Sequence, residues 1–489
     1  MKSIQKSNAF LPFLVLIFGL FTINISAQSH KAKIDALLKK YKEYEQFNGS
    51  VLVADQGNLI INGGYGMANM EWDIDNDADT KHRLGSISKQ FTSMLIMLLV
   101  EEGKLDLNVP ITTYLTDYPK TTGDQITIHH LLTHSSGIPN YTSFPNFFNE
   151  KSRNPYEVDV FIKEFSDMAL EFEPGSTYKY SNSGYFLLGA IAEKVTGNTY
   201  EQELNDRIFT PLKMVNTGFD HHASILKKRA TGYQKNGSNY SNSDYLDMSI
   251  PYAAGSLYST ADDLYIWDKS LREGLLLSEE NYKIMMSGHI QAWGGSYGYG
   301  WGIRKAYSES KKDSVMEYSH GGGINGFNTL ITRVPADKNV VILLNNTGGA
   351  PLNQITVAIN AILDDKPYDL PKMSLADALL ETFNNDGIDK GMTQYEELKN
   401  HNEYNLDEGQ MNRTGYSLLQ SGKVKEAIAI FNINVQEFPE SSNPYDSLAE
   451  AYLADGQKDL ALKNYKKAFE MDPKNVNAKK IIDDLEANK

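Results

Sequence analysis

The sequence contains no cysteine, which excludes two devices that are common in exported proteins. No disulfide can form, and no lipid can be attached to an N-terminal cysteine. Stability must therefore come from buried apolar cores, and an apolar content of 41% over 489 residues is enough for ordinary ones. The length predicts two to three domains.

Long hydrophobic runs are also scarce, and only residues 9–23 form a nearly unbroken one. Lys2 and Lys6 precede this run, and the small residues Ser26 and Ala27 follow it. The layout predicts a secretory signal peptide over residues 1–27, because the run is short for a membrane span and no other follows downstream. A retained N-terminal anchor is the alternative. We expect an exported chain, periplasmic or secreted, with no membrane span in its mature part.

Basic residues are few relative to acidic ones, 47 against 62. Removal of the signal peptide takes away Lys2 and Lys6 and no acid, which leaves 45 basic residues and a net charge of −17. A chain this acidic, without a basic run, is not expected to bind nucleic acid or an anionic membrane. The simplest interpretation of the charge is solubility.

Hydrophobic periodicity predicts elements in an order typical of an α+β fold. Residues 30–46 have apolar positions at helical spacing, and a helix-rich region follows between about residues 86 and 215. Alternating apolar residues predict strands on either side of that region, at residues 49–54, 59–64, 297–304, 316–320, 327–334 and 340–345, with a helix over 351–363. This order indicates that N- and C-terminal segments share one sheet.

The pattern changes beyond residue 363, where helical periodicity takes over. A period of 34 residues relates Gly422, Ala427, Phe431 and Pro439 to Gly456, Ala461, Tyr465 and Pro473. This is the spacing and residue pattern of a tetratricopeptide repeat, and residues 375–400 are a degenerate candidate for a further helical pair. Two clear units are fewer than a free-standing array needs. We therefore expect the repeats to pack on the preceding domain or to bind a protein partner.

The Ser-x-x-Lys pattern occurs five times, and its surroundings single out one occurrence. Only Ser86 follows a short extended stretch ending in glycine and also opens a long apolar helix. Free backbone N–H groups at a helix start favour an oxyanion that develops beside the serine. Lys89 lies one turn deeper, where a buried lysine can be neutral and accept the hydroxyl proton. We predict Ser86 as nucleophile and Lys89 as its base; the alternative is a capping serine with a surface lysine.

Tyr180-Ser181-Asn182 is a second candidate element, because an apolar helix over residues 186–195 follows it. A tyrosine in this place can relay protons, and the Asn182 amide can orient a substrate amide. The identical triplet at residues 240–242 lies in a polar stretch with no helix behind it, and it is predicted to be a loop.

His320-Gly321-Gly322 is a third candidate element, at the end of a predicted strand. Glycines there allow a substrate backbone to approach the strand edge closely. The N–H of Gly323 can then complete an oxyanion hole with the N–H of Ser86. Residues 321–326 also match a dinucleotide-binding pattern, but a strand follows them instead of a helix, so no nucleotide cofactor is predicted.

Two histidines give a competing signal. His130 and His134 stand four residues apart, as a zinc pair on one helix face would. No third ligand is placed to complete a site, so we predict no metal and no other cofactor. His134 is expected to be a structural hydrogen bonder. The aromatic run at residues 297–301 fits the lining of a cleft and packing within the sheet equally well.

These three elements, in this order, resemble the family of penicillin-binding proteins and class C β-lactamases, which includes DD-peptidases, D-aminopeptidases and esterases. The resemblance covers about residues 31–362, and residues 127–139 and 254–264 within that range resemble the family too. It implies a β-lactamase/transpeptidase-like α+β fold: an antiparallel sheet with flanking helices, beside an all-helical region. The expected organisation is a signal peptide (1–27), a hydrolase domain (28–363), a linker (364–374) and a tetratricopeptide-like helical domain (375–489).

The resemblance also implies an acyl-enzyme on Ser86, with Lys89 and Tyr180 as partners, that water hydrolyses. His320 stands where class C β-lactamases have the lysine of Lys-Thr-Gly, and a histidine there is more typical of peptidases and esterases. We expect an exported serine hydrolase acting on D-amino-acid peptides or small esters. The alternatives are a β-lactamase and a non-catalytic penicillin-binding or scaffold protein that works through its repeats.

The side chain of His320 leads us to expect that substrate affinity depends on pH. A lysine at this place would be cationic across neutral pH and could hold a substrate carboxylate. A histidine has an ordinary pKa of about 6.5, so its charge is conditional near neutrality. If His320 holds a carboxylate, affinity for free-acid substrates is expected to strengthen as the pH falls through that range.

Overall fold

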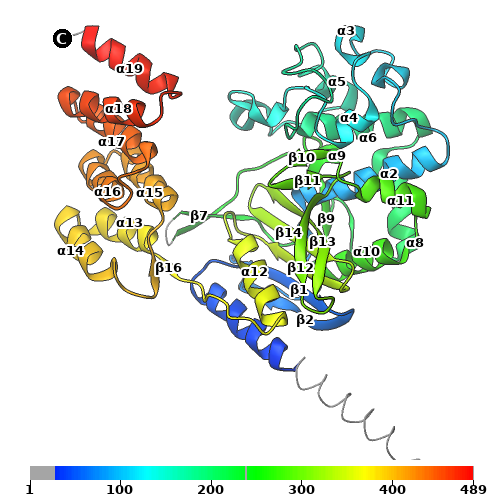
Figure 1. The fold of residues 1–489 in the computed structure, drawn as a ribbon, viewed down its shortest axis with the longest axis horizontal. Helices are drawn as coiled ribbons and strands as arrows, with labels where there is room; N and C mark the ends of the chain where they lie inside the picture. The colour runs from blue at the N-terminus through cyan, green and yellow to red at the C-terminus, as the bar shows by residue number, and fades with distance from the viewer. Residues whose placement is uncertain (1–27, 237–238, 488–489) are drawn as a thin grey trace, which may run out of the picture. The chain divides into compact units, whose positions relative to one another are not determined.

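A computed structural model describes residues 28–236 and 239–487, so the predicted signal peptide lies outside the described residues. The chain divides into two compact units (Figure 1). The first contains the described residues up to Gln234 together with Asn242–Leu370, and the second contains Lys235–Ser241 and the chain from Pro371 onward. Within the described ranges, no helix combines the length and apolar character that crossing a bilayer requires.

An antiparallel sheet of eight strands organises the first unit. The strand order is β10 (Ile290–Ala292), β11 (Gly295–Tyr297), β12 (Gly302–Ser308), β13 (Asp313–Ile324), β14 (Phe327–Val334), β15 (Asn339–Asn345), β1 (Gly49–Asp55) and β2 (Asn58–Tyr65). β1 pairs with β15, with Gly49 opposite Asn345. The N- and C-terminal segments of this unit therefore share one sheet, as the sequence predicts.

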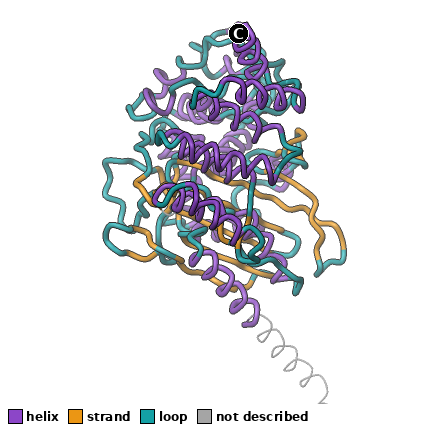
Figure 2. Tube along the Cα trace, turned by 90° about the vertical axis from the view of Figure 1, so that its left-hand side faces the viewer, coloured by secondary structure: helices purple, strands orange, loops and turns teal. Residues whose placement is uncertain are grey.

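Side chains alternate between two cores along each central strand, because successive residues of a strand face opposite sides of the sheet. On β1, Val51 and Val53 belong to a core that the helix of residues 28–43 and α12 (Leu352–Leu363) cover. Leu52 belongs to the larger core on the other face, which α10 (Ala261–Glu273) covers. Helices thus pack on both faces of the strands. Figure 2 distinguishes the helices and the strands by colour.

An all-helical region joins the strand-rich ends of this unit, around α2 (Ser88–Glu101), α6 (Asn182–Thr196) and α9 (Tyr252–Gly255). Its other helices are α3 (Lys120–Gly123), α4 (Ile128–Leu132), α5 (Val158–Ile162), α7 (Tyr200–Leu204), α8 (Thr210–Leu212) and α11 (Glu279–Met286). Short strands accompany them: β3 (Met67–Asn69), β4 (Ile74–Asp75), β5 (His82–Arg83), β6 (Gly218–Phe219) and β9 (Leu257–Ser259). A separate pair, β7 (Tyr233–Asn236) and β8 (Asn239–Asn242), contributes residues to both units. Apolar faces of α2, α6 and α9 meet in the larger core.

Two local expectations were wrong. The strand expected over residues 297–304 is interrupted: β11 ends at Tyr297, and β12 begins at Gly302. The chain leaves the sheet to pass against α2, since Gly300 has a φ of +80° and a Cβ there would lie 3.0 Å from the Lys89 carbonyl oxygen. The triplet at residues 240–242, expected to be a loop, lies in strand β8.

The second unit is helical with regular spacing. Its helices are α13 (Leu375–Asn385), α14 (Ile388–Leu398), α15 (Glu408–Gln420), α16 (Val424–Glu437), α17 (Ser442–Ala454), α18 (Lys458–Met471) and α19 (Val476–Ala487), with short strands β16 (Met373–Ser374) and β17 (Tyr404–Asn405). α17 begins 34 residues after α15, α18 begins 34 after α16, and α19 begins 34 after α17. Two apolar clusters within the unit supply its core.

Candidate active site

Ser86 lies at the junction of the sheet and the helical region. It belongs to a single 3-10 turn, η1 (Gly85–Ile87), which runs directly into α2. Gly85 has a φ of +54°, and a Cβ there would lie 2.9 Å from the backbone nitrogen of Gly323 in β13. A glycine is therefore needed immediately before the serine, both for the left-handed backbone and for the close approach to the strand.

Lys89 lies behind the serine and has no exposed surface. Its Nζ is 3.0 Å from Ser86 Oγ, 2.8 Å from Asn182 Oδ1 and 2.8 Å from the carbonyl oxygen of Ala254. Burial without an acidic partner lowers the pKa of Lys89 well below its ordinary value. The two carbonyl oxygens can only accept, so a neutral amine gives both its N–H groups to them and turns its lone pair to the Ser86 hydroxyl.

Tyr180 contributes a second hydroxyl to the same place. Its phenol is a hydrogen-bond partner of Ser86, and Lys89 Nζ lies 4.8 Å from the centroid of its ring. Burial raises the pKa of Tyr180 above its ordinary value, so the phenol keeps its proton at neutral pH. A neutral phenol beside a neutral amine and a serine hydroxyl makes a short path for proton transfer.

His134 holds the segment that carries Tyr180. Its Nδ1 accepts the N–H of Ser181 at 3.2 Å, and its backbone carbonyl accepts the N–H of Lys179 at 2.9 Å. The imidazole also lies against the Tyr180 ring, with centroids 4.1 Å apart. His134 is therefore the structural hydrogen bonder that the sequence predicts, and Nδ1, as acceptor, leaves the proton on Nε2.

Asn182 is the first residue of α6, and both ends of its side chain are engaged. Its Oδ1 accepts from Lys89, and its Nδ2 donates to Thr142 Oγ1 at 3.2 Å. Its backbone N–H donates to Asn140 Oδ1 at 3.0 Å. The amide is thereby fixed at the rim of the site with its oxygen directed at the lysine.

His320 differs from the expectation drawn from its sequence position. It is only 3% exposed, and Nδ1 lies 2.7 Å from the carbonyl oxygen of Gly321. The carbonyl can only accept, so Nδ1 carries the proton and Nε2 accepts from the Tyr297 hydroxyl at 3.0 Å. Burial, reinforced by the nearby Lys89, lowers the pKa of His320 to about 3. The expectation of a group that becomes charged near neutrality is therefore corrected: the imidazole is neutral at physiological pH.

The glycines after His320 bring β13 against the serine turn. A Cβ at Gly322 would overlap the carbonyl oxygen of Leu84. That oxygen also accepts a hydrogen bond from Thr329 Oγ1 at 2.7 Å. Replacing this glycine would push the strand away from the residues that precede Ser86. Gly323, by contrast, has open space where its Cβ would be.

The backbone of Gly323 faces the open edge of β13. β12 pairs with this strand only as far as Ser319. The two-residue turn at 325–326 makes Ile324 and Phe327 the closing hydrogen-bonded pair of β13 and β14. Hydrogen-bonded and non-hydrogen-bonded pairs alternate along an antiparallel ladder, so the next pair, Gly323 and Asn328, is not hydrogen-bonded. The N–H of Gly323 is therefore turned from β14 toward the serine turn, where it can act with the N–H of Ser86 on an oxyanion.

Several groups around this cluster were not predictable from the sequence. The Ala254 carbonyl accepts from Lys89, the Trp293 ring contacts Tyr180 and His320, and the Tyr297 ring contacts His320. Tyr178 packs on Trp293. Residues 254–264 resemble the family and residues 297–301 are rich in aromatic side chains, but the local sequence assigns neither stretch a contact. Their contacts depend on segments distant in the sequence.

His130 has a structural partner of its own. Its Nδ1 accepts the N–H of Thr127 at 3.2 Å, which closes a capping box at the start of α4. Over residues 28–236 and 239–487, no three potential ligands among His, Cys, Asp and Glu are grouped as a metal site would need.

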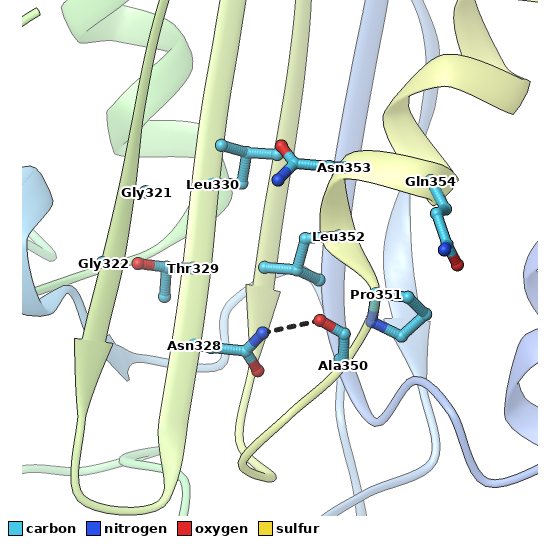
Figure 3. A pocket seen from close by; sticks show the side chains of 10 residues that line it. All are labelled: Gly321, Gly322, Asn328, Thr329, Leu330, Ala350, Pro351, Leu352, Asn353 and Gln354. Carbon is cyan, nitrogen blue, oxygen red and sulfur yellow. Dashed lines mark hydrogen bonds between the residues drawn. The ribbon is translucent and has the colours of Figure 1, made fainter. Parts of the chain in front are cut away.

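A separate cavity of about 420 Å³ adjoins β13 near the first residues of α12 (Figure 3). Gly321 and Gly322 border it from the sheet, and Asn328 donates to the Ala350 carbonyl at its rim at 2.9 Å. Neither Ser86 nor the groups that hydrogen-bond to it line this cavity, so it is not the candidate active site.

Comparison with known proteins agrees with this geometry. Residues 34–363 match the profile of the family described as Beta-lactamase. The chain is 30% identical to the putative penicillin-binding protein PbpX of Bacillus subtilis over 67% of its own length and 78% of the relative's. It is 28% identical to the teichoic acid D-alanine hydrolase of Staphylococcus aureus over 68% of this chain and 78% of that relative. The octameric penicillin-binding protein homologue of Pyrococcus abyssi is similar in structure, with a TM-score of 0.60 and 28% identity over 72% of this chain and 81% of that one.

Proposed function

Because the chain belongs to the β-lactamase family and is a serine hydrolase, we propose that it works through an acyl-enzyme on Ser86. One observation carries this proposal. The buried Lys89 amine has two carbonyl acceptors for its N–H groups and the Ser86 hydroxyl as its third neighbour. That arrangement directs a lone pair at the proton that must leave the serine.

The proposed reaction moves one proton around the cluster. Ser86 gives its proton to Lys89 while Oγ bonds to the substrate carbonyl carbon, and the N–H groups of Ser86 and Gly323 hold the oxyanion. As the tetrahedral intermediate breaks its bond to the leaving group, Tyr180 donates its proton to that group and recovers one from Lys89. In deacylation, water attacks the acyl carbon and gives a proton to the Lys89–Tyr180 pair. The same pair returns a proton to Ser86 Oγ as it leaves the acyl carbon.

The proposed substrates are D-amino-acid peptides and small esters. One relative, the teichoic acid D-alanine hydrolase, is concerned with D-amino-acid chemistry by name. The neutral His320 does not offer the fixed cation that a carboxylate-bearing β-lactam would use. β-Lactamase activity is for that reason the second candidate.

The segments outside the hydrolase unit have proposed roles too. We propose that residues 1–27 are a signal peptide and that the protein acts in the periplasm or outside the cell. We further propose that the C-terminal helices are tetratricopeptide repeats that bind a partner or dock within the chain. The 34-residue spacing of their helix starts supports this. A non-catalytic scaffold that works through these repeats is the third candidate.

Substitution of the serine tests the proposal. Ser86→Ala is expected to lower ester turnover by at least roughly 10³-fold and to abolish labelling by a fluorophosphonate probe. Lys89→Ala is expected to be nearly as damaging, because a nucleophile and its base act as a unit. Ser176→Ala and Ser224→Ala are matched controls, since each removes the serine of another Ser-x-x-Lys pattern. Labelling that survives Ser86→Ala and disappears in a control variant would contradict the proposal. Rapid hydrolysis of benzylpenicillin would favour the second candidate.

A further inference from the structure

An unusual turn stands beside the candidate active site. β10 and β11 are joined by the two residues Trp293 and Gly294, with Ala292 and Gly295 as the closing pair. Both turn residues have positive φ, +52° for Trp293 and +74° for Gly294. A hairpin turn of this kind prefers asparagine followed by glycine, and a bulky residue in the left-handed region is strained.

The strained position places the Trp293 indole against the site. Its ring contacts are with Tyr297 (centroids 5.4 Å apart), Tyr178 (5.7 Å), His320 (5.8 Å) and Tyr180 (6.0 Å). Trp293 nevertheless remains 60% exposed as a residue. A side chain with one face on candidate catalytic groups and the other in solvent is available to a bound substrate. Local strain of this sort is typical of functional positions.

The contacts also indicate which part of a substrate would meet the indole. Under the proposed function, Tyr180 gives its proton to the leaving group, so that group must lie next to the phenol. The indole of Trp293 contacts the rings of Tyr180 and His320. Trp293 therefore borders the leaving-group side of the site.

We propose that Trp293 is a specificity-determining residue that forms the wall of the leaving-group subsite. This subsite takes neutral leaving groups with a flat apolar surface, such as phenols, in preference to leaving groups that carry a carboxylate. The inference rests on the proposed function. The ring neighbours of Trp293 are three phenols and a neutral imidazole, so no cation beside it would hold a carboxylate. The face of an indole carries negative potential, which lets it stack on a neutral ring but does not attract an anion.

Three acetate esters with different leaving groups test the inference, since they form the same acyl-enzyme. The kcat/KM for phenyl acetate, divided by that for methyl acetate, is expected to fall about three- to tenfold in Trp293→Asn, which removes stacking and keeps a residue that suits the turn. The preference of the unaltered chain for phenyl acetate over 4-carboxyphenyl acetate is expected to narrow in the same variant. Trp293→Phe, which retains a flat ring, is expected to stay closer to the unaltered chain.

Controls separate the possible failures. Trp72→Asn makes the same change at another exposed tryptophan, and it should leave both ratios within twofold of the unaltered chain. Ratios that also stay within twofold in Trp293→Asn, while the probe still labels Ser86, would overturn this inference alone. Equal losses for all three esters would also overturn it, because Trp293 would then only support Tyr180. Absence of probe labelling at Ser86 in the unaltered chain would overturn the proposed function and the inference together.

Discussion

At the scale of single residues, the candidate site consists of titratable groups that burial keeps uncharged. Lys89, Tyr180 and His320 lie within one cluster, and burial favours the neutral form of each. A charge left in such a place without a counter-ion is costly. The neutral groups can therefore exchange a proton when a substrate arrives, and none of them supplies a permanent cation.

The neutrality of His320 gives a binding prediction. Its pKa is about 3, so it stays uncharged between pH 8 and pH 5. In Ser86→Ala enzyme, the ratio of the affinity for a carboxylate-bearing substrate to that for its neutral methyl ester is expected to stay within about twofold of its value at pH 8 over this range. Titration calorimetry of both ligands at each pH measures this. A clear strengthening for the acid alone as the pH falls through 6.5 would show that His320 becomes cationic.

A stability prediction follows from His82, another buried histidine. Its Nδ1 is 3.1 Å from the Thr80 carbonyl oxygen, and burial lowers its pKa to about 4. Between about pH 4 and 6.5 the unfolded chain binds a proton here that the folded chain does not, so stability is lost as the pH falls through this window. The loss from pH 7 to pH 5 is roughly 2 kcal/mol.

His82→Asn isolates that contribution, because the amide can donate to Thr80 and does not titrate. The free energy of unfolding, measured with urea at several pH values, is expected to decline less steeply with falling pH in this variant than in the unaltered chain. His222→Asn, which removes an exposed imidazole, is the control for the loss of a histidine as such. An unchanged slope in His82→Asn would contradict the account of this histidine.

At the scale of elements, the site depends on close backbone contact between the serine turn and β13. A Cβ at Gly322 would overlap the Leu84 carbonyl, whereas Gly323 has free space for one. Gly322→Ala is therefore expected to destabilise the fold by about 1–3 kcal/mol, while Gly323→Ala should stay within about 1 kcal/mol of the unaltered chain. Urea midpoints measure both, and equal destabilisation by the two substitutions would contradict this contact.

The sequence predicts these elements where the signal is local. A glycine before Ser86 and an apolar run after it indicate a helix start, and alternating residues on β1, β14 and β15 indicate strands. The break after Tyr297 was not predictable in this way, because it depends on the approach of Gly300 to α2. The protonation of His320 was missed for a similar reason, since its burial comes from rings far away in the sequence.

At the scale of the whole molecule, each of the two units has apolar clusters of its own. Every candidate catalytic residue lies in the first unit. A chain that ends after Leu370 is therefore expected to keep measurable esterase activity, and any loss should appear in solubility or stability. Turnover and circular dichroism of the truncated chain check this. A folded, soluble truncation with no activity would mean that the C-terminal helices are needed for the active site.

The most direct test of the account is the position of a covalent adduct on the unaltered protein. Trypsin is expected to release residues 84–89 as one peptide, which contains Ser86 and also Ser88. Ser88 is buried, and its Oγ accepts the N–H of Leu257 at 3.1 Å, so it is not available to a probe. Tandem mass spectrometry after fluorophosphonate labelling is predicted to place the adduct on Ser86. An adduct on Ser88, Ser176 or Ser224 would contradict the central claim.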